Sequence, residues 1–184
     1  PGDLVMLEGM GGGLTWGAAL LRAYAAYLKQ IQSGYGIRFI AETLSRHKQI
    51  SALLIDYFYA LFDPALQSGR DSSVARVREK LLQAIDAVVN LSEDSVLRGF
   101  LNLMDGTLRT NFFQHEPSQS PKDYFSFKFN PEKIDGVPLP RPKFEIFVFS
   151  RHMEGVHLRG GRVARGGLRW SDRTEDYRTE VLGL

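Results

Sequence analysis

The sequence of 184 residues contains no cysteine, which excludes disulfides, thiolate metal sites and cysteine nucleophiles. It has no run of 18 apolar residues, so we expect no membrane span and no membrane partner. The start lacks a basic segment followed by an apolar run, so we expect no secretory signal. A protein without disulfides or a signal suits a reducing compartment, and we expect a cytoplasmic location.

An excess of one charge is also missing. The chain has 23 basic and 21 acidic residues and a formal net charge of +2, which says little about its partners. A hydrophobic fraction of 43% is typical of a globular protein, and the length suffices for a core in one or two domains. The chain opens on Pro1 and stops inside an expected helix, so we expect it to be a piece of a longer protein.

Residues 1–115 are expected to form a helical region of five helices. Thr15 is expected to cap the first helix and Ser92 the fifth, while a polar linker at Gln67–Ser73 precedes the fourth. Asp63–Pro64 is expected to end the third helix. The five apolar stripes at helical spacing are Leu20, Leu21, Tyr24, Leu28 and Ile31; Ile37, Ile40, Ala41 and Leu44; Leu53, Leu54, Tyr57, Phe58 and Leu61; Val74, Val77, Leu81, Ile85 and Val88; and Leu97, Phe100, Leu101, Met104 and Leu108.

The pattern changes to strands after this region. Residues 116–142 are a proline-rich connection with one strand, in which Phe125, Phe127 and Phe129 alternate with polar residues. Residues 143–184 begin with the strand Lys143–Ser150, which is apolar on both faces and therefore expected to be central. Two more strands, or one strand with a glycine-rich bend, lead to a final helix capped by Thr174. The fold class is therefore α+β, with a helical block, a small mixed β-sheet and a terminal helix.

The stretch "HLRGGRVARGGLRWSD", which starts at His157, combines fixed positive charge with bare backbone. Four glycines allow close approach of a ligand, and arginines bind carboxylate or phosphate with two parallel hydrogen bonds. The combination suits a pocket for a small dianion. A bulge with a solvated arginine face is the structural alternative. A phosphate loop over Gly161–Gly166 is disfavoured because Gly167 and Leu168 replace the lysine and the hydroxyl.

Other cofactor and ligand motifs are weaker. The "GMGGGL" segment fails as a dinucleotide fingerprint because Leu14 replaces the third glycine, so no cofactor-binding residues are assigned. An Arg-Gly-Gly segment for nucleic acid is usually disordered, whereas apolar residues interrupt the triplets here. The histidines show no metal spacing, so we expect surface or structural roles for them and no metal site; they are His47, His115, His152 and His157.

The segment from Phe144 to Leu184, with "HLRGGRVARGGLRWSDRTEDYRTEVLGL", resembles the large bacterial NAD-dependent glutamate dehydrogenases. The upstream segments "LTWGAALLRAYAAYLKQ", "LIDYFYALFDP" and "LRGFLNLMDGTLRTNFFQ" are similar to the helical region before the catalytic domain of that family. The resemblance implies an oxidoreductase that converts L-glutamate to 2-oxoglutarate and ammonia with NAD. Residues 143–184 would then begin its α/β substrate-binding domain, and we expect a homo-oligomer that binds no nucleic acid.

The same resemblance implies a substrate site. Arg165, Gly166, Gly167 and Arg169 occupy the places of the Lys-Gly-Gly-x-Arg motif of shorter glutamate dehydrogenases, whose lysine contacts the substrate carboxylate. The first triplet, Arg159–Gly161, is expected to serve a turn between strands. The catalytic residues and the NAD-binding domain are expected beyond Leu184, so residues 1–184 alone should be inactive. The alternatives are a non-catalytic module that binds nucleic acid or an acidic partner, and a structural or oligomerisation segment.

Overall fold

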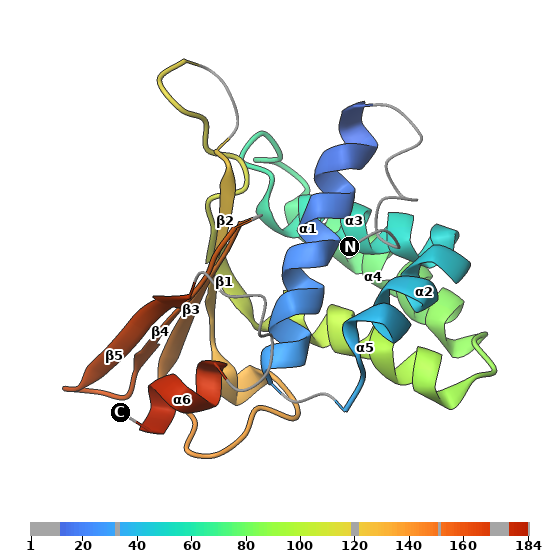
Figure 1. Ribbon diagram of the computed structural model, residues 1–184. Coiled ribbons are helices and arrows are strands. Elements are labelled where there is room, and N and C mark those ends of the chain that lie inside the picture. The colour runs from blue at the N-terminus through green and yellow to red at the C-terminus, as the bar shows by residue number, and fades with distance from the viewer. Residues whose placement is uncertain (1–11, 32–33, 119–121, 151, 170–176, 184) are drawn as a thin grey trace. The chain divides into compact units, whose positions relative to one another are not determined.

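The computed structural model describes residues 12–31, 34–118, 122–150, 152–169 and 177–183. Within them the fold is α+β, as predicted: a helical block precedes a five-stranded sheet and a terminal helix (Figure 1). The helices are α1 Gly12–Gln30, α2 Ile37–Arg46, α3 Lys48–Phe62, α4 Arg70–Asp86, α5 Leu91–Gly106, a short 3-10 helix Pro131–Lys133, and α6 Tyr177–Gly183. The strands are β1 Thr107–Thr110, β2 Tyr124–Phe129, β3 Phe144–Ser150, β4 Glu154–Arg159 and β5 Ala164–Arg169.

The chain divides into two compact units. Unit 1 comprises Pro1–Ala25 and Tyr35–Leu101, and unit 2 comprises Ala26–Gly34 and Asn102–Leu184. Helices α1 and α5 therefore each contribute residues to both units. The domain limits predicted after residues 115 and 142 stay predictions.

Unit 1 is helical, and its apolar stripes form its core. In α2 the predicted Ile40, Ala41 and Leu44 are buried, and in α3 so are Leu54, Tyr57 and Phe58. Helix α3 ends at Phe62, directly before the predicted stop. The guanidinium of Arg70 at the start of α4 donates to the carbonyls of Leu61 and Asp63, both at 2.6 Å, and so satisfies carbonyl groups that the end of α3 leaves unpaired.

Three helix starts differ from the predictions. Helix α1 begins at Gly12, before Thr15, and α4 begins at Arg70, inside the predicted linker. Helix α5 begins at Leu91, and the Asn90 Oδ1 atom accepts from the backbone N–H groups of Ser92 and Glu93 at 3.0 and 3.2 Å. Asn90 is therefore the capping residue of α5. Ser92 fits the cap pattern equally well in sequence but lies one residue inside the helix.

The end of α5 also differs from the prediction, since Leu108 lies in β1 and is 40% exposed. The helix stops at Gly106, whose carbonyl accepts from the Asn130 backbone N–H at 2.8 Å. A Cβ atom at Gly106 would lie 2.3 Å from Ile134 Cγ1, so only glycine fits this close approach. Pairing of β1 with β2 therefore overrides the helical periodicity of the local sequence.

Unit 2 contains the sheet, whose order β1-β2-β3-β4-β5 follows the chain. The prediction that Lys143–Ser150 forms a central strand is confirmed by β3, and the predicted phenylalanines of β2 are buried. All described strand pairs are antiparallel, whereas a mixed sheet was predicted. The reason is connectivity: among the described residues no α-helix lies between successive strands, and each chain reversal gives an antiparallel pair.

The glycine-rich stretch forms two strands joined by a tight turn. Strands β4 and β5 pair from Glu154 with Arg169 to Arg159 with Ala164. The turn is closed by a hydrogen bond from the Gly160 N–H to the Val163 carbonyl at 3.1 Å, and Gly161 has a φ of 106° that favours glycine. Arg159–Gly161 therefore leads into the turn, as predicted.

One face of the sheet is covered inside unit 2. The Tyr27 ring, in the last turns of α1, stacks on Phe129 with centroids 4.3 Å apart and lies 5.2 Å from the Phe147 ring. Helix α6, red in Figure 1, packs on β4 and β5 through the buried Tyr177 and Val181. Thr174 and Leu184, the predicted cap and the last apolar residue of this helix, lie outside the described residues.

Candidate functional site

Strand β5 carries the predicted substrate site, and it is an edge strand of the sheet. Arg165, Gly166 and Gly167 are exposed. Opposite partners in an antiparallel pair point to the same face, and successive residues alternate between faces. Arg165 and Gly167 pair with the buried residues Leu158 and Val156, so they lie on the α6 face of the sheet.

The other two predicted residues differ in position. Gly166 pairs with the exposed His157 and so lies on the open face, opposite to α6. The backbone of Arg169 pairs with Glu154 at the end of β5, and its side chain lies outside the described part of the chain. The structure thus brings Arg165 and Gly167 to one face, and it separates Gly166 from them.

The Arg165 guanidinium is held by α6. Its Nη1 atom donates to the Leu182 carbonyl at 2.6 Å, a short charge-assisted hydrogen bond. The acceptor is a backbone carbonyl of α6, so the bond joins β5 to that helix. This bond orients one end of the Arg165 guanidinium. Its other N–H groups have no hydrogen-bond acceptor among the described residues.

Close packing explains both glycines of the second triplet. A Cβ atom at Gly167 would lie 3.0 Å from the Tyr177 Oη atom of α6, and one at Gly166 would lie 2.9 Å from the Val156 carbonyl oxygen of β4. The absence of side chains here therefore lets α6 approach one face and keeps β4 and β5 close on the other. The glycines serve the scaffold of the site, whatever ligand approaches it.

The open face of the sheet has a shallow depression beside the glycines. It is mostly apolar, and its one titratable side chain is the exposed His157. An isolated histidine without a described acid or nucleophile beside it makes no acid–base pair. The lining residues are Ile146, Val148, Gly155, Val156, His157, Gly166, Gly167 and Leu168.

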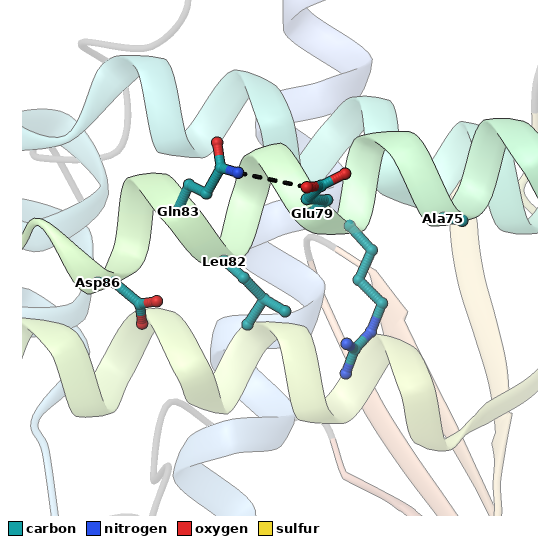
Figure 2. Close-up of a pocket in the computed structure, with 6 residues that line it drawn as sticks. Ala75, Glu79, Leu82, Gln83 and Asp86 are labelled. Carbon is teal, nitrogen blue, oxygen red and sulfur yellow. Dashed lines mark hydrogen bonds between the residues drawn. The ribbon is translucent and has the colours of Figure 1, made fainter.

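A second depression is lined by residues of α4 (Figure 2). The Gln83 Nε2 atom donates to the Glu79 Oε1 atom at 3.5 Å, and Asp86 accepts from Arg98 of α5 at 2.6 Å. The carboxylate of Asp86 is thus engaged in an exposed ion pair, and no nucleophile faces it among the residues in Figure 2. We assign no chemistry to this surface.

A buried ion pair between β3 and α6 was not predicted from the sequence. Glu145 of β3 and Arg178 of α6 are both fully buried, and the Arg178 Nε atom lies 2.9 and 3.1 Å from the two Glu145 carboxylate oxygens. Burial raises the pKa of the Glu145 carboxyl, while the hydrogen bonds and the charge of Arg178 oppose this rise. Glu145 is the only acid in the apolar strand "FEIFVFS", and this was the signal that could have located the pair.

The described residues contain no cluster of histidines and acids that could hold a metal ion. Of the histidines, His47 lies with its Nε2 atom 2.7 Å from the carboxylate of Glu93, which also pairs with Arg46. Among the same residues, no helix is long and apolar enough to cross a membrane.

Residues 80–184 match the family model "Bacterial NAD-glutamate dehydrogenase, catalytic domain", which includes the whole sheet and α6. The chain belongs to this family. Residues 5–64 match a second model, "Glutamate dehydrogenase, helical motif 3", which covers α1, α2 and α3. The resemblance inferred from the sequence is therefore confirmed.

Relatives agree with this membership. The chain is 51% identical over 175 residues to the NAD-specific glutamate dehydrogenase of Pseudomonas aeruginosa, a match that covers 93% of the chain. It is 48% identical over 176 residues to that of Halomonas elongata and 47% over 178 residues to that of Mycobacterium tuberculosis, with 95% of the chain covered in both. The match spans 11% of the length of each relative.

Proposed function

We propose that this chain is the segment of an NAD-specific glutamate dehydrogenase that joins its helical region to its catalytic domain. The whole enzyme then catalyses the oxidative deamination of L-glutamate to 2-oxoglutarate and ammonia. The observation that carries this proposal is the catalytic-domain match over residues 80–184, which includes the Arg-Gly-Gly strand. Residues 1–184 alone are expected to be inactive.

Within that enzyme, β5 is proposed to bind a substrate carboxylate. Glutamate and 2-oxoglutarate each carry two carboxylates, and an unpaired charge in a closed cleft is costly, so each needs a fixed donor. The exposed Arg165 guanidinium suits this role because the Leu182 carbonyl orients one arm and leaves the remaining donors for a carboxylate. Gly167 lies on the same face, and we propose that Arg169 contributes from the end of the strand. Gly166 contributes through its peptide backbone only.

NAD supplies the hydride acceptor when it is bound, and the protein positions the substrate relative to it. The described strands pair antiparallel and include no βαβ unit of the kind that binds dinucleotides. We propose that NAD binding and the catalytic residues belong to other parts of the enzyme, outside residues 1–184. The homo-oligomer and the cytoplasmic location stay predictions.

The test is Arg165→Ala in the full-length dehydrogenase, with steady-state kinetics for both substrates. Loss of a charged hydrogen bond of about 1.5–3 kcal/mol predicts a rise of roughly 10- to 150-fold in the glutamate KM, while the NAD KM stays within about two-fold. Arg162→Ala is the matched control, because Arg162 is an exposed arginine in the turn of the same hairpin. An unchanged glutamate KM in Arg165→Ala removes the carboxylate role of β5.

A further inference from the structure

The buried pair of Glu145 and Arg178 has a geometry that goes beyond filling the core. The Arg178 Nη2 atom lies 3.0 Å from Glu145 Oε2, and Nε reaches both oxygens of the same carboxylate. Two N–H groups of one guanidinium therefore bond to one carboxylate. Such a pair fixes both the distance and the relative orientation of the two side chains, whereas a single point charge fixes only the distance. It ties α6 to the central strand of the sheet at one defined position.

A second set of bonds fixes the start of α6. The side chain of Gln30, in the last turn of α1, accepts from the Arg178 backbone N–H at 3.1 Å and donates to Glu154 of β4 at 2.8 Å. The Tyr27 hydroxyl lies next to the ion pair, and burial together with the Glu145 charge raises its pKa well above the usual range. Tyr27 therefore stays neutral beside the pair. Arg178 thus bonds to the end of α1 and to β3, and Gln30 links this contact to β4.

Stability alone does not require such a pair. Removing two charges from water is costly, and replacement of a buried ion pair by apolar residues of similar size is often neutral or stabilising. The described residues of α6 bury two apolar side chains, Tyr177 and Val181. What the pair supplies to α6 is a fixed position on the sheet.

The position of α6 in turn determines that of Arg165. The Leu182 carbonyl, one turn after Arg178, accepts the 2.6 Å hydrogen bond that orients the Arg165 guanidinium. We propose that Glu145 and Arg178 are positioning residues for substrate binding: they hold α6 so that Leu182 presents Arg165 to the substrate carboxylate. This inference rests on the proposed function, and neither residue touches the substrate.

The experiment uses the full-length dehydrogenase with the double substitution Glu145→Leu and Arg178→Met, which removes both charges and keeps the site apolar. We expect the melting temperature to stay within a few degrees, because both charges are removed together. The glutamate KM should rise roughly ten- to a hundred-fold, the range that small displacements in an active site produce, with the NAD KM within about two-fold. The matched control replaces the partly exposed pair of unit 2, Glu116→Leu with Lys122→Met, and should leave both KM values unchanged.

Two further measurements sharpen this test. If the pair acts through Arg165, the double substitution should add nothing to the glutamate KM in the Arg165→Ala background, because coupled residues are not additive. The single variant Arg178→Lys keeps the charge without the fork and should give a smaller rise than Arg178→Met. If the double variant does not fold, Glu145→Gln replaces it, because glutamine keeps the shape of the side chain and removes its charge. The glutamate KM should then rise while the NAD KM stays within about two-fold.

The outcomes separate the two proposals. If Arg165→Ala raises the glutamate KM and the double variant does not, the positioning role is wrong and the proposed site survives. If the double variant raises both KM values together as its melting temperature falls, the pair is merely structural and the inference is also wrong. If Arg165→Ala itself has no effect, the proposed site fails, and the positioning role fails with it.

Discussion

The packing of Gly166 allows a sharp prediction about the hairpin of β4 and β5. In Gly166→Ala, the new Cβ atom would lie 2.9 Å from the Val156 carbonyl oxygen and 3.2 Å from the His157 ring. The first contact is with backbone, which cannot rotate away as a side chain does. Strand β5 must therefore shift relative to β4 by several tenths of an ångström.

The expected size of this effect follows from overpacking, which typically destabilises by about 1–3 kcal/mol. The loss should be local, because β5 is an edge strand and pairs only with β4 among the described strands. Hydrogen exchange of backbone amides in the full-length protein measures this local stability. Amides of the paired residues in β4 and β5 should exchange roughly 5- to 150-fold faster in Gly166→Ala.

Gly160→Ala is the matched control within the same hairpin. Its Cβ atom would meet nothing within 4 Å, and Gly160 does not have a positive φ that would strain an alanine. Exchange in β4 and β5 should therefore change little. Equal protection in the two variants would refute the argument that Gly166 is fixed by the approach of β4.

Two other substitutions test the packing and the capping described above. Gly167→Ala should loosen α6 by about 1 kcal/mol because its Cβ atom would lie 3.0 Å from the Tyr177 hydroxyl, and Tyr177→Phe, which deletes that hydroxyl, should restore hydrogen-exchange protection of α6. Asn90→Ala should destabilise the start of α5 by about 1 kcal/mol, and Ser92→Ala should have a smaller effect, as measured by hydrogen exchange of the first turn; a larger loss in Ser92→Ala would return the cap to that residue.

The sequence predicted those features that depend on local periodicity. The alternation of Phe125, Phe127 and Phe129 determines which face of β2 is buried, because a strand has a period of two. The apolar stripe of α2 likewise determines which face of that helix is buried, with a period of 3.6 residues. The family itself could also be inferred, since the Arg-Gly-Gly segment is distinctive.

The features that the sequence did not predict depend on contacts between distant segments. The prediction that the fifth helix extends to Leu108 was wrong, because β1, which contains Leu108, pairs with β2 after a gap of more than ten residues. Glu145 interrupts an apolar strand, but its partner Arg178 is 33 residues away, and no local pattern links the two. The separation of Gly166 from Arg165 follows from the pleat of a strand, whereas the motif alone suggested one continuous binding surface.

Unit 2 combines an early segment of the chain with a late one, and this affects its folding during synthesis. The strands of unit 2 are consecutive neighbours, so the meander can form from local contacts as it leaves the ribosome. Its cover is not local, because Gln30 meets Glu154 across 124 residues of chain. The Tyr27 side chain is therefore synthesised long before Phe129 of β2 and Phe147 of β3, against which its ring packs. Until β3 emerges, the growing chain must keep this aromatic side chain from contacting other partners.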